Sequence, residues 1–250
     1  MVKVLLCGAC GKMGGNVLSL LDGDNEATVV CGVDLYPKEI GVPVYKSFAD
    51  VKEDVDVIID FSSPNGLAER LEFAKTRGAG IVLAATGFTA DDLALVKEYE
   101  KSVAIFRTAN LSLGINLMQA LVKAAAQVLG DAFDVEIIEK HHNLKKDAPS
   151  GTALMLADSV NEAFDGQKEF VYGREGIVGA REKKEVGIHA VRGGTIVGEH
   201  EVIFAGEDEV ITISHMAYSR AIFGNGAIAA AKFLAGKEAG YYNMGHVINA

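Results

Sequence analysis

The chain is poor in cysteine, proline and basic residues, and it contains no tryptophan. Its three cysteines are an odd number in 250 residues, which argues against the disulfide framework of a small secreted protein. Lysine and arginine together number 24 against 34 aspartates and glutamates, so the formal net charge is −10. A general binder of nucleic acid or anionic membranes needs a broad basic surface, and the composition argues against both classes.

The chain also lacks long apolar runs. None approaches the roughly 18 uninterrupted apolar residues of a membrane span. The first residues, Met1–Cys7, have neither the cationic start nor the cleavage pattern of a signal peptide. Hydrophobic residues nevertheless make up 49% of the chain, which is ample for a packed core. We therefore expect a soluble, cytoplasmic, globular protein with one large domain or two modest ones.

Strand-like and helix-like segments alternate through the first third of the chain. The short apolar runs that are typical of buried strands are Val2–Cys7, Ala27–Val33, Val55–Ile59, Ile81–Ala84 and Val103–Phe106. The segments with helical spacing between them are Lys12–Leu21, about Pro64 to Thr76, and Asp91–Lys101. Fully apolar strands separated by helices predict an α/β domain, with a doubly wound parallel sheet covered on both faces.

The pattern changes after Asn110. Ser112 is a plausible N-cap for a long helix through Leu129, which Gly130 would end. The segments that follow are a strand at Phe133–Lys140, a helix at Thr152–Phe164, strands at Val186–Arg192, Thr195–Phe204 and Val210–His215, and a helix at Ala221–Leu234. This mixture of strands and helices predicts an α+β domain.

The last three predicted strands are interpreted as consecutive and antiparallel, with Gly193-Gly194 as a tight hairpin turn. The final alanine-rich helix needs a sheet to bury its apolar face, so Ala221–Ala250 is expected to return to the first domain. We therefore predict a doubly wound domain of residues 1–111 and 218–250. The second domain, residues 112–217, is expected to hold an open mixed sheet.

A glycine-rich turn follows the first predicted strand and opens the first helix. It comprises Gly8, Ala9, Cys10, Gly11, Lys12, Met13 and Gly14, with the spacing GxxGxxG. Glycines let the backbone turn sharply and approach a pyrophosphate, whose charge then rests on the helix N-terminus. Asp34, at the end of the second predicted strand, can accept hydrogen bonds from ribose hydroxyls. Together these contexts favour a dinucleotide site over a merely structural turn.

Asp34 favours NAD(H), because a carboxylate there would repel a 2′-phosphate, while Lys12 and Lys38 leave use of NADPH open. Two further loops follow predicted strands, Ala85-Thr86-Gly87-Phe88 and Thr108-Ala109-Asn110-Leu111. Ligands of open α/β sheets bind outside the carboxyl ends of the strands, so we expect both loops near the nicotinamide. The alternative for these loops is simple turn chemistry.

Cys7 and Cys10 form a CxxC pattern within the same turn. A redox site needs a group that stabilises a thiolate, and a zinc site needs about four ligands. Only Cys31 remains elsewhere in the chain, so packing is the favoured interpretation of these cysteines.

The segment from residue 141 to residue 152 is cationic in an otherwise acidic chain. It combines His141, His142, Lys145 and Lys146 with the step Pro149-Ser150-Gly151-Thr152. Ser150 is a natural N-cap, and the free N–H groups of a helix start form a cradle for a carboxylate or phosphate.

Each lone histidine could instead be a satisfied core or surface residue, and the two lysines a solvated face. Clustering of these groups favours catalysis or substrate binding. No metal is expected at His141 and His142, because no acidic or cysteine partner sits at ligand spacing.

These motifs resemble those of the 4-hydroxy-tetrahydrodipicolinate reductase (dihydrodipicolinate reductase) family of the diaminopimelate route to lysine. The resemblance runs nearly end to end, and its most specific block is E-x-HHxxKxDAPSGTAL, from Glu139 to Leu154. The other blocks are GACGKMG, Asp60-Phe61-Ser62-Ser63-Pro64, ATGF (85–88), ANLSLGIN (109–116), Arg174-x-Gly-x-x-Gly-x-Arg181, Arg192-Gly-Gly, Gly198-Glu199-His200 and Ser214-His215 through Gly240.

The resemblance implies an NAD(P)H-dependent oxidoreductase that transfers hydride to a cyclic imine dicarboxylate. It implies His141 as the proton donor and Lys145 as a second catalytic donor. The residues that it implies for the substrate carboxylates are His142, Lys145, Ser150, Gly151 and Thr152. Those that it implies for the cofactor are Gly8 to Met13, Asp34, Ala84, Ala85, Thr86, Thr108, Ala109, Asn110 and Leu111. It also implies a Rossmann domain, a substrate domain that builds a homotetramer, and domain closure over the substrate.

The sequence departs from the family pattern at several positions. Lys12 stands where the family often has arginine, and Leu35 where some members have arginine, and both bear on the choice between NADH and NADPH. Ala84 replaces a common glycine, and His246 stands where aspartate is common. Lys146 and His246 receive no role.

Two other functions are compatible with a nucleotide loop of this kind. One is a different two-domain dehydrogenase, acting on aspartate or a sugar, which would lack the HHxxKxDAPSGT block. The other is a non-catalytic NAD(H)-binding sensor, which would need the nucleotide loop but no proton donor.

Overall fold

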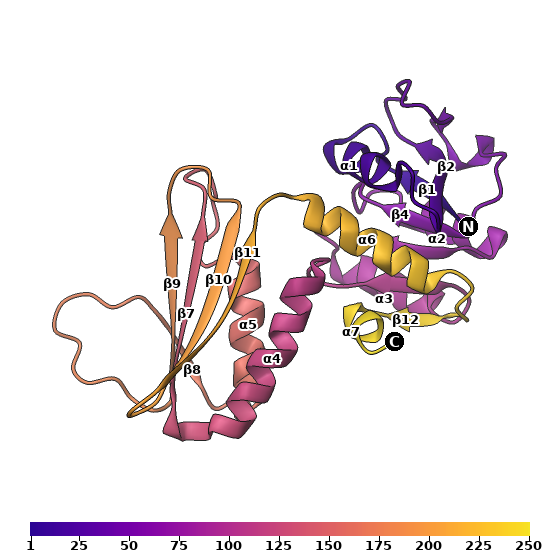
Figure 1. Ribbon diagram of the computed structural model, residues 1–250. Coiled ribbons are helices and arrows are strands. Elements are labelled where there is room, and N and C mark those ends of the chain that lie inside the picture. Colours follow the sequence, from indigo (N-terminus) through magenta and orange to yellow (C-terminus); the bar gives the residue numbers. More distant parts are fainter. The chain divides into compact units, whose positions relative to one another are not determined.

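The computed structural model describes residues 1–250, and the chain divides into two compact units. The first unit comprises Met1–Ser112 and Ala221–Ala250, and the second comprises Leu113–Arg220. Each unit has its own sheet and its own core (Figure 1).

The first unit is built on a parallel sheet of seven strands in the order β12-β6-β5-β4-β1-β2-β3. The strands are β1 (Val2–Cys7), β2 (Ala27–Val33), β3 (Val44–Tyr45), β4 (Val57–Asp60), β5 (Gly80–Leu83), β6 (Ala104–Arg107) and β12 (Gly240–Tyr242). The helices are α1 (Lys12–Leu21), α2 (Leu67–Arg77), α3 (Ala90–Tyr99), α6 (Ala221–Leu234) and α7 (Met244–Ile248), with a short 3₁₀ helix at Phe48–Asp50. The direction of strand order reverses between β1 and β4, which is where doubly wound sheets bind ligands.

Helices cover both faces of this sheet, as the buried apolar runs of its strands require. Val4 and Leu6 of β1 pack on one face in a core that includes Val17 of α1 and residues of α6. Their neighbour Leu5 points to the other face, where it shares a core with Leu71 of α2. Successive side chains of a strand alternate between faces, so an apolar run of this kind is stable only between two helical layers. The doubly wound Rossmann-type architecture predicted from the sequence is confirmed.

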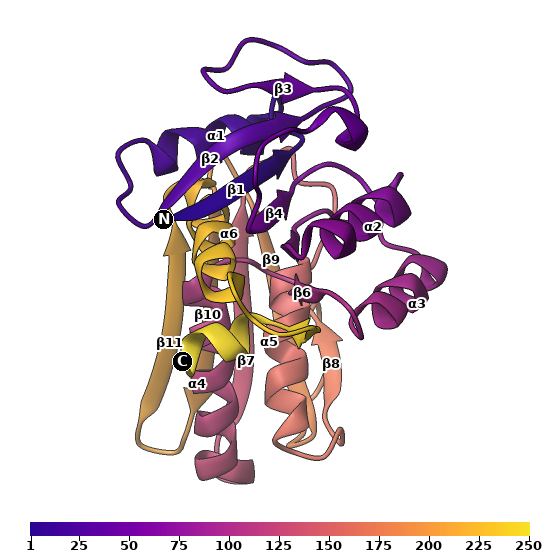
Figure 2. The same cartoon turned by 90° about the vertical axis from the view of Figure 1, so that its right-hand side faces the viewer.

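The second unit is built on a mixed sheet of five strands in the order β11-β10-β7-β9-β8. The strands are β7 (Asp134–His141), β8 (Glu169–Tyr172), β9 (Glu185–Arg192), β10 (Gly198–Ala205) and β11 (Val210–Ala217). The helices are α4 (Leu113–Leu129) and α5 (Gly151–Glu162), with a 3₁₀ turn at Gly130–Ala132. Both helices lie along the same face of the sheet and leave its other face without a helical layer (Figures 1 and 2).

The predicted hairpin between the strands now labelled β9 and β10 is wrong. These two strands do not pair, because β7 lies between them, parallel to β9 and antiparallel to β10. The Gly193-Gly194 step instead crosses the end of β7, where the N–H of Gly193 donates to the carbonyl of His141. The N–H of Asn143 donates in turn to the carbonyl of Gly194. The glycines therefore lie beside the histidine segment.

One helical stretch, Leu113–Ala132, is long and apolar enough to cross a membrane by length and composition, with a mean hydropathy of 1.2. In the second unit this stretch is α4 with the short 3₁₀ turn that follows it. The residues Ile115, Met118 and Val122 are buried in the core that α4 shares with α5 and the sheet. A core helix of this kind passes the same compositional test.

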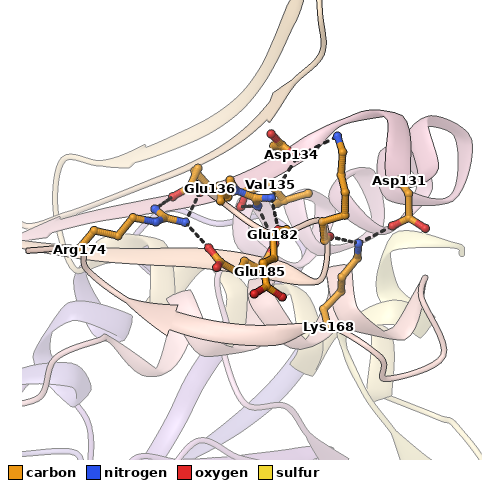
Figure 3. Close-up of polar contacts among 10 residues, drawn as sticks. Asp131, Asp134, Val135, Glu136, Lys168, Arg174, Glu182 and Glu185 are labelled. Atoms are coloured by element: carbon orange, nitrogen blue, oxygen red, sulfur yellow. Dashed lines mark hydrogen bonds and ion pairs between the residues drawn. The ribbon is translucent and has the colours of Figure 1, made fainter. Parts of the chain in front are cut away.

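The segment between β8 and β9 is held to the sheet by a network of ion pairs (Figure 3). Arg174 donates two hydrogen bonds to Glu136 of β7 and one to Glu185. Arg181 reaches the same Glu136 through Nε at 3.0 Å. Burial would raise the pKa of Glu136, but the hydrogen bonds from Arg174, His189 and Arg181 outweigh it and lower that pKa to about 2. The arginines of the Arg174–Arg181 motif thus fasten this loop.

Candidate active site

The end of β7 places His141 beside a buried carboxylate. His141 is the last residue of the strand, and Glu139 lies two positions earlier, so the two side chains share a face. The Nδ1 atom of His141 lies 2.6 Å from Oε2 of Glu139. An ionised carboxylate only accepts hydrogen bonds, so this contact assigns a proton to Nδ1 and directs Nε2 away from Glu139.

Arg192 neutralises the Glu139 carboxylate from the neighbouring strand. It ends β9, pairs in register with His141, and donates from Nη1 and Nη2 to the two oxygens of Glu139 at 2.7 Å each. Burial would raise the pKa of Glu139, but the hydrogen bonds from Arg192, His141 and the Ser150 N–H lower it. Nη2 of Arg192 also donates to the carbonyl of Asp147 at 2.7 Å, which holds the loop that leads into α5.

Ser150 begins α5 as the sequence predicts. Its Oγ accepts a hydrogen bond from the N–H of Ala153 at 3.1 Å, which is the geometry of a side-chain N-cap. Its own N–H donates to Oε1 of Glu139 at 2.9 Å. Ser150 is buried and engaged by these partners, while the next residue, Gly151, is exposed. Gly151 and Thr152 are therefore the first helical residues of the predicted anion cradle.

His200 of β10 contacts both Ser150 and His141. Its Nε2 lies 3.0 Å from Oγ of Ser150, and its ring meets that of His141 edge to face, with 5.2 Å between centroids. Burial and the neighbouring His141 lower the pKa of His200 to about 4. His200 is therefore neutral near pH 7 and adds no positive charge to the site.

The turn after β7 carries the remaining predicted groups. Nζ of Lys145 lies 2.9 Å from a carboxylate oxygen of Asp147, and this ion pair lowers the pKa of Asp147. Nδ1 of His142 is buried and has no hydrogen-bond partner. Lys146 is exposed to solvent. The turn thus places the Lys145 ammonium and the His142 ring in the same short segment as His141.

Gly198 of β10 leaves room beside the imidazole of His141. A Cβ atom at this position would lie 3.1 Å from Nε2 of His141, which is tighter than an ordinary van der Waals contact. The glycine therefore keeps side-chain atoms away from the ring nitrogen that faces away from Glu139.

The glycine-rich turn of the first unit has the geometry that a pyrophosphate needs. Gly8 has φ of +73°, a left-handed conformation that favours glycine, and its N–H donates to the carbonyl of Val33. The N–H of Gly11 donates back to the carbonyl of Gly8 at 3.0 Å, closing the turn before α1. The N-cap position of α1 is Gly11, which has no side chain to cap the first N–H groups of the helix.

Asp34 lies beside this turn at the end of β2. Its Oδ2 accepts a hydrogen bond from the N–H of Cys10 at 3.0 Å, and its Oδ1 accepts one from the N–H of Tyr36 at 2.9 Å. A cavity of about 530 Å³ opens here, lined by Gly8, Asp34, Ser62 and Arg70 among others. The glycine turn, the anchored carboxylate and the cavity fit the adenosine half of a dinucleotide.

The two other predicted loops follow neighbouring strands of the same sheet. Ala84, Ala85 and Thr86 come directly after β5, and Thr108 to Leu111 come after β6, its partner in the sheet. Oγ1 of Thr108 donates to the carbonyl of Asn110, and the side chain of Asn110 accepts from the N–H of Ser112. These loops therefore lie on the same carboxyl edge as the glycine turn.

The cysteines pack as expected. Cys7 and Cys31 are buried and Cys10 is partly buried, and all three are free thiols. Burial raises the pKa of Cys7 well above its ordinary value and that of Cys31 to about 12. Such thiols are almost fully protonated at neutral pH.

Sequence reasoning assigned no role to Glu139, Arg192 or His200. All three residues belong to the family motifs quoted above. Their contacts with one another and with His141 depend on β7 lying between β9 and β10. Glu139 and Arg192 are 53 residues apart in the sequence, and only the pairing of β7 with β9 brings them together. An acid two residues before a histidine on a predicted strand was the one signal that could have linked Glu139 to His141.

Comparison with known proteins shows the family of the chain. The family models described as "Dihydrodipicolinate reductase, N-terminus" and "Dihydrodipicolinate reductase, C-terminus" match residues 2–111 and 114–248. The chain belongs to the dihydrodipicolinate reductase family. The 4-hydroxy-tetrahydrodipicolinate reductase of Caldanaerobacter subterraneus subsp. tengcongensis is 51% identical over 98% of this chain and 97% of that protein. The enzyme of the same name from Clostridium botulinum is 44% identical, over 99% and 98%.

A solved member of the dihydrodipicolinate reductase family has the same fold. It is the dipicolinate-bound dihydrodipicolinate reductase from Paenisporosarcina sp. TG-14, with a TM-score of 0.80, 25% identity and 97% coverage of both chains. An aspartate dehydrogenase from Thermotoga maritima, at 15% identity and a TM-score of 0.50 over 95% of this chain and 98% of that one, shares the fold alone. Membership of the family therefore makes this chain a reductase, and the rival dehydrogenase and sensor functions are not favoured.

Proposed function

We propose that this chain catalyses the NAD(P)H-dependent reduction of 4-hydroxy-tetrahydrodipicolinate to tetrahydrodipicolinate in the diaminopimelate route to lysine. The observation that carries the proposal is the hydrogen bond between His141 and Glu139 beside the start of α5. That arrangement joins a proton donor to an anion cradle, in a chain whose family and relatives carry this activity in their names.

The first unit is inferred to bind the dinucleotide. The backbone of residues 8–13 would hold the pyrophosphate at the start of α1, and Asp34 the adenosine ribose. The loops 84–86 and 108–111 would line the nicotinamide end. When bound, the nicotinamide supplies the hydride, and the chain's own residues orient the reactants and offset charge.

The second unit is inferred to bind the dicarboxylate substrate. The ammonium of Lys145 and the N–H groups at the start of α5, from Gly151 and Thr152, would offset the charge of the carboxylates. His142 and Ser150 belong to the same segment and complete the inferred substrate residues. His200, neutral near pH 7, leaves this positive charge to Lys145 and the helix start.

His141 is the inferred proton donor, with Lys145 as the second. Loss of the 4-hydroxyl group as water gives the conjugated cyclic imine that accepts the hydride. Glu139 holds Nδ1 of His141, so Nε2 is the ring atom that would deliver a proton to the carbon next to the reduced centre. Such proton transfer contributes roughly 10²–10⁴-fold to the rate.

NADH is inferred to be the favoured cofactor. Both oxygens of Asp34 already accept backbone hydrogen bonds, which fixes a negative charge where a 2′-phosphate would lie. No arginine follows Asp34, because position 35 is leucine. The measurement that decides the preference is kcat/KM for NADH and for NADPH.

The second unit is also inferred to assemble a homotetramer, and the protein is inferred to be cytoplasmic. The face of the second sheet that α4 and α5 leave uncovered exposes Val191, Val210 and Met216. An exposed apolar face of this kind is typical of a contact between subunits. Sedimentation velocity at micromolar concentration would give the mass, and a monomer would contradict the assembly.

The test of the proposal is oxidation of NADH in the presence of the product of the preceding aldolase step. Aspartate and sugar substrates serve as comparisons. His141→Gln is expected to lower kcat far more than it raises KM, whereas Thr152→Val is expected mainly to weaken substrate binding. His189→Gln, a histidine bound to Glu136 on the other face of the sheet, is the matched control. Tight NADH binding without oxidation with any substrate would favour the sensor instead.

A further inference from the structure

We propose that Glu139 is a positioning residue that holds the proton donor and the start of α5 in one fixed arrangement. The inference rests on the proposed function and deepens it, because it assigns a role to a residue that contacts neither substrate nor cofactor. The side chain of Glu139 is fully buried, so it acts through its protein partners.

The two carboxylate oxygens divide their partners evenly. Oε1 accepts from the N–H of Ser150 at 2.9 Å and from Nη2 of Arg192 at 2.7 Å. Oε2 accepts from Nδ1 of His141 at 2.6 Å and from Nη1 of Arg192 at 2.7 Å. Each oxygen therefore takes one bond from the arginine and one from the site. The planar carboxylate of Glu139 therefore binds both the proton donor, His141, and the residue that begins the anion cradle, Ser150.

A buried carboxylate is stable only when it is paired and hydrogen-bonded, and Arg192 provides that pairing. The fork of the guanidinium also fixes the plane of the carboxylate, because both of its terminal nitrogens are engaged. With that plane fixed, Oε2 sets the direction of the His141 ring. The same arginine holds the carbonyl of Asp147, so the loop before α5 is tied to the same centre.

The charge of Glu139 also matters for the protonated form of His141. The ring of His141 contacts Glu139 on its own strand and His200 on β10, and Arg192 on β9 binds the same Glu139 oxygen. Lys145 in the following turn is paired with Asp147. Glu139 is the anion in direct contact with the ring. Glu139→Gln removes this anion while Arg192 keeps its positive charge, which disfavours the imidazolium that must donate the proton.

The competing explanation is that Glu139 only neutralises Arg192 and stabilises the fold. The two explanations differ in what happens when His141 is already absent. A positioning residue that works through His141 loses its effect on kcat in that background, whereas a residue that only supports the fold keeps it.

The experiment is a double-mutant cycle with Glu139→Gln, His141→Gln and the double variant. Steady-state kcat and KM are measured with NADH and the proposed substrate across pH. Glu139→Gln is expected to lower kcat roughly 10- to 100-fold. The limb of the kcat profile that reports loss of the proton donor is expected to move to lower pH. In the His141→Gln background the same change is expected to alter kcat less than about threefold.

Glu136→Gln is the matched control. Glu136 lies on the same strand and is also bound by arginines and a histidine, but its side chain points to the opposite face. Its replacement is expected to leave the pH profile of kcat unchanged. An equal loss of kcat for Glu139→Gln with and without His141, or an unshifted profile, would overturn the proposal.

A second measurement does not depend on the variant folding. Nitrogen-15 NMR of the histidine rings in the wild-type enzyme reports which ring nitrogen carries the proton in the neutral form. His141 is expected to carry it on Nδ1, and a proton on Nε2 would overturn the proposal. Failure of the proposed function itself is distinguishable, because the wild-type enzyme would then not oxidise NADH with this substrate.

Discussion

Asp60 and Arg70 form a buried ion pair at the carboxyl end of β4, with 2.8 Å between Oδ2 and Nε. Asp60 is fully buried and Arg70 is 5% exposed. The guanidinium also donates to the backbone carbonyls of Ser63 and Asn65. The pair therefore fastens the segment between β4 and α2, which lines the cavity inferred to hold the adenosine.

Arg70→Met is expected to destabilise the protein by about 3–5 kcal/mol, because it leaves the Asp60 carboxylate buried without a cation. Burial raises the pKa of Asp60, and Arg70 opposes that rise. Without Arg70 the folded-state pKa of Asp60 rises further, so protonation of this carboxyl favours folding. The loss in free energy of unfolding caused by Arg70→Met is therefore expected to be largest near pH 8 and to become smaller towards about pH 5.

Urea unfolding at both pH values measures this effect. Arg77→Met on the same helix is the control, because Arg77 is exposed and donates to two backbone carbonyls. Its loss is expected to cost about 1 kcal/mol and to be independent of pH. Equal, pH-independent losses for the two variants would contradict the account of the ion pair.

The strands of the first unit could be predicted because their physics is local. The run Val4–Cys7 is apolar and buried at every position, and only a sheet between two helical layers buries both faces. The second unit shows where local reasoning ends. Alternation identifies β7, β9 and β10 as strands, but it does not say which strand lies beside which. The prediction of a β9–β10 hairpin failed for this reason.

The candidate site also combines features that are local in the sequence with features that depend on strand pairing. The N-cap at Ser150 is a local pattern, and the structure has it where the sequence places it. The partners of Glu139 are not local, because Arg192 and Ser150 reach it from other elements. A buried acid on a strand is recognisable only once the pairing that neutralises it is known.

Gly226→Ala is expected to destabilise the first unit by about 1–3 kcal/mol. A Cβ atom at this position of α6 would overlap the carbonyl oxygen of Leu111, so the backbone must shift. Leu111 belongs to a loop inferred to line the nicotinamide end, and KM for NADH is therefore expected to rise as well.

Gly15→Ala is the matched control for this prediction. It is also a glycine in a helix, but a Cβ there meets nothing within 4 Å. The substitution is expected to stabilise the protein by about 0.5–1 kcal/mol through helix propensity. Thermal unfolding of both variants gives the signs, and a stabilising Gly226→Ala would contradict the contact.

Asp34→Asn is expected to raise the ratio of kcat/KM for NADPH over NADH about tenfold, which is about 1.4 kcal/mol. The substitution removes the charge that would repel a 2′-phosphate while keeping a polar side chain beside the N–H of Cys10. Asp22→Asn, at the exposed C-cap of α1, is the control and is expected to leave the ratio unchanged. An unchanged ratio for Asp34→Asn would show that other groups set the preference.

His200 is expected to make stability depend on pH in a narrow window. Burial and the charge of His141 lower its pKa from 6.5 to about 4, so between these values the unfolded chain binds the proton more tightly. Stability is therefore fully present above about pH 6.5 and is lost as the pH falls towards about 4, by about 3 kcal/mol in total. Urea unfolding of the wild type and of His200→Gln across this range measures the difference.

Between about pH 6.5 and about pH 5, the effect of His200 on stability can be distinguished from the effects of the acidic groups. Asp24 and Glu136 have pKa values lowered to about 2, so their contributions are lost only when the pH falls below the ordinary carboxyl range. His215, whose pKa is also lowered by burial, is present in both proteins and cancels in the comparison. A loss between about pH 6.5 and about pH 5 that is equal in wild type and His200→Gln would mean that His200 is not held neutral in the fold.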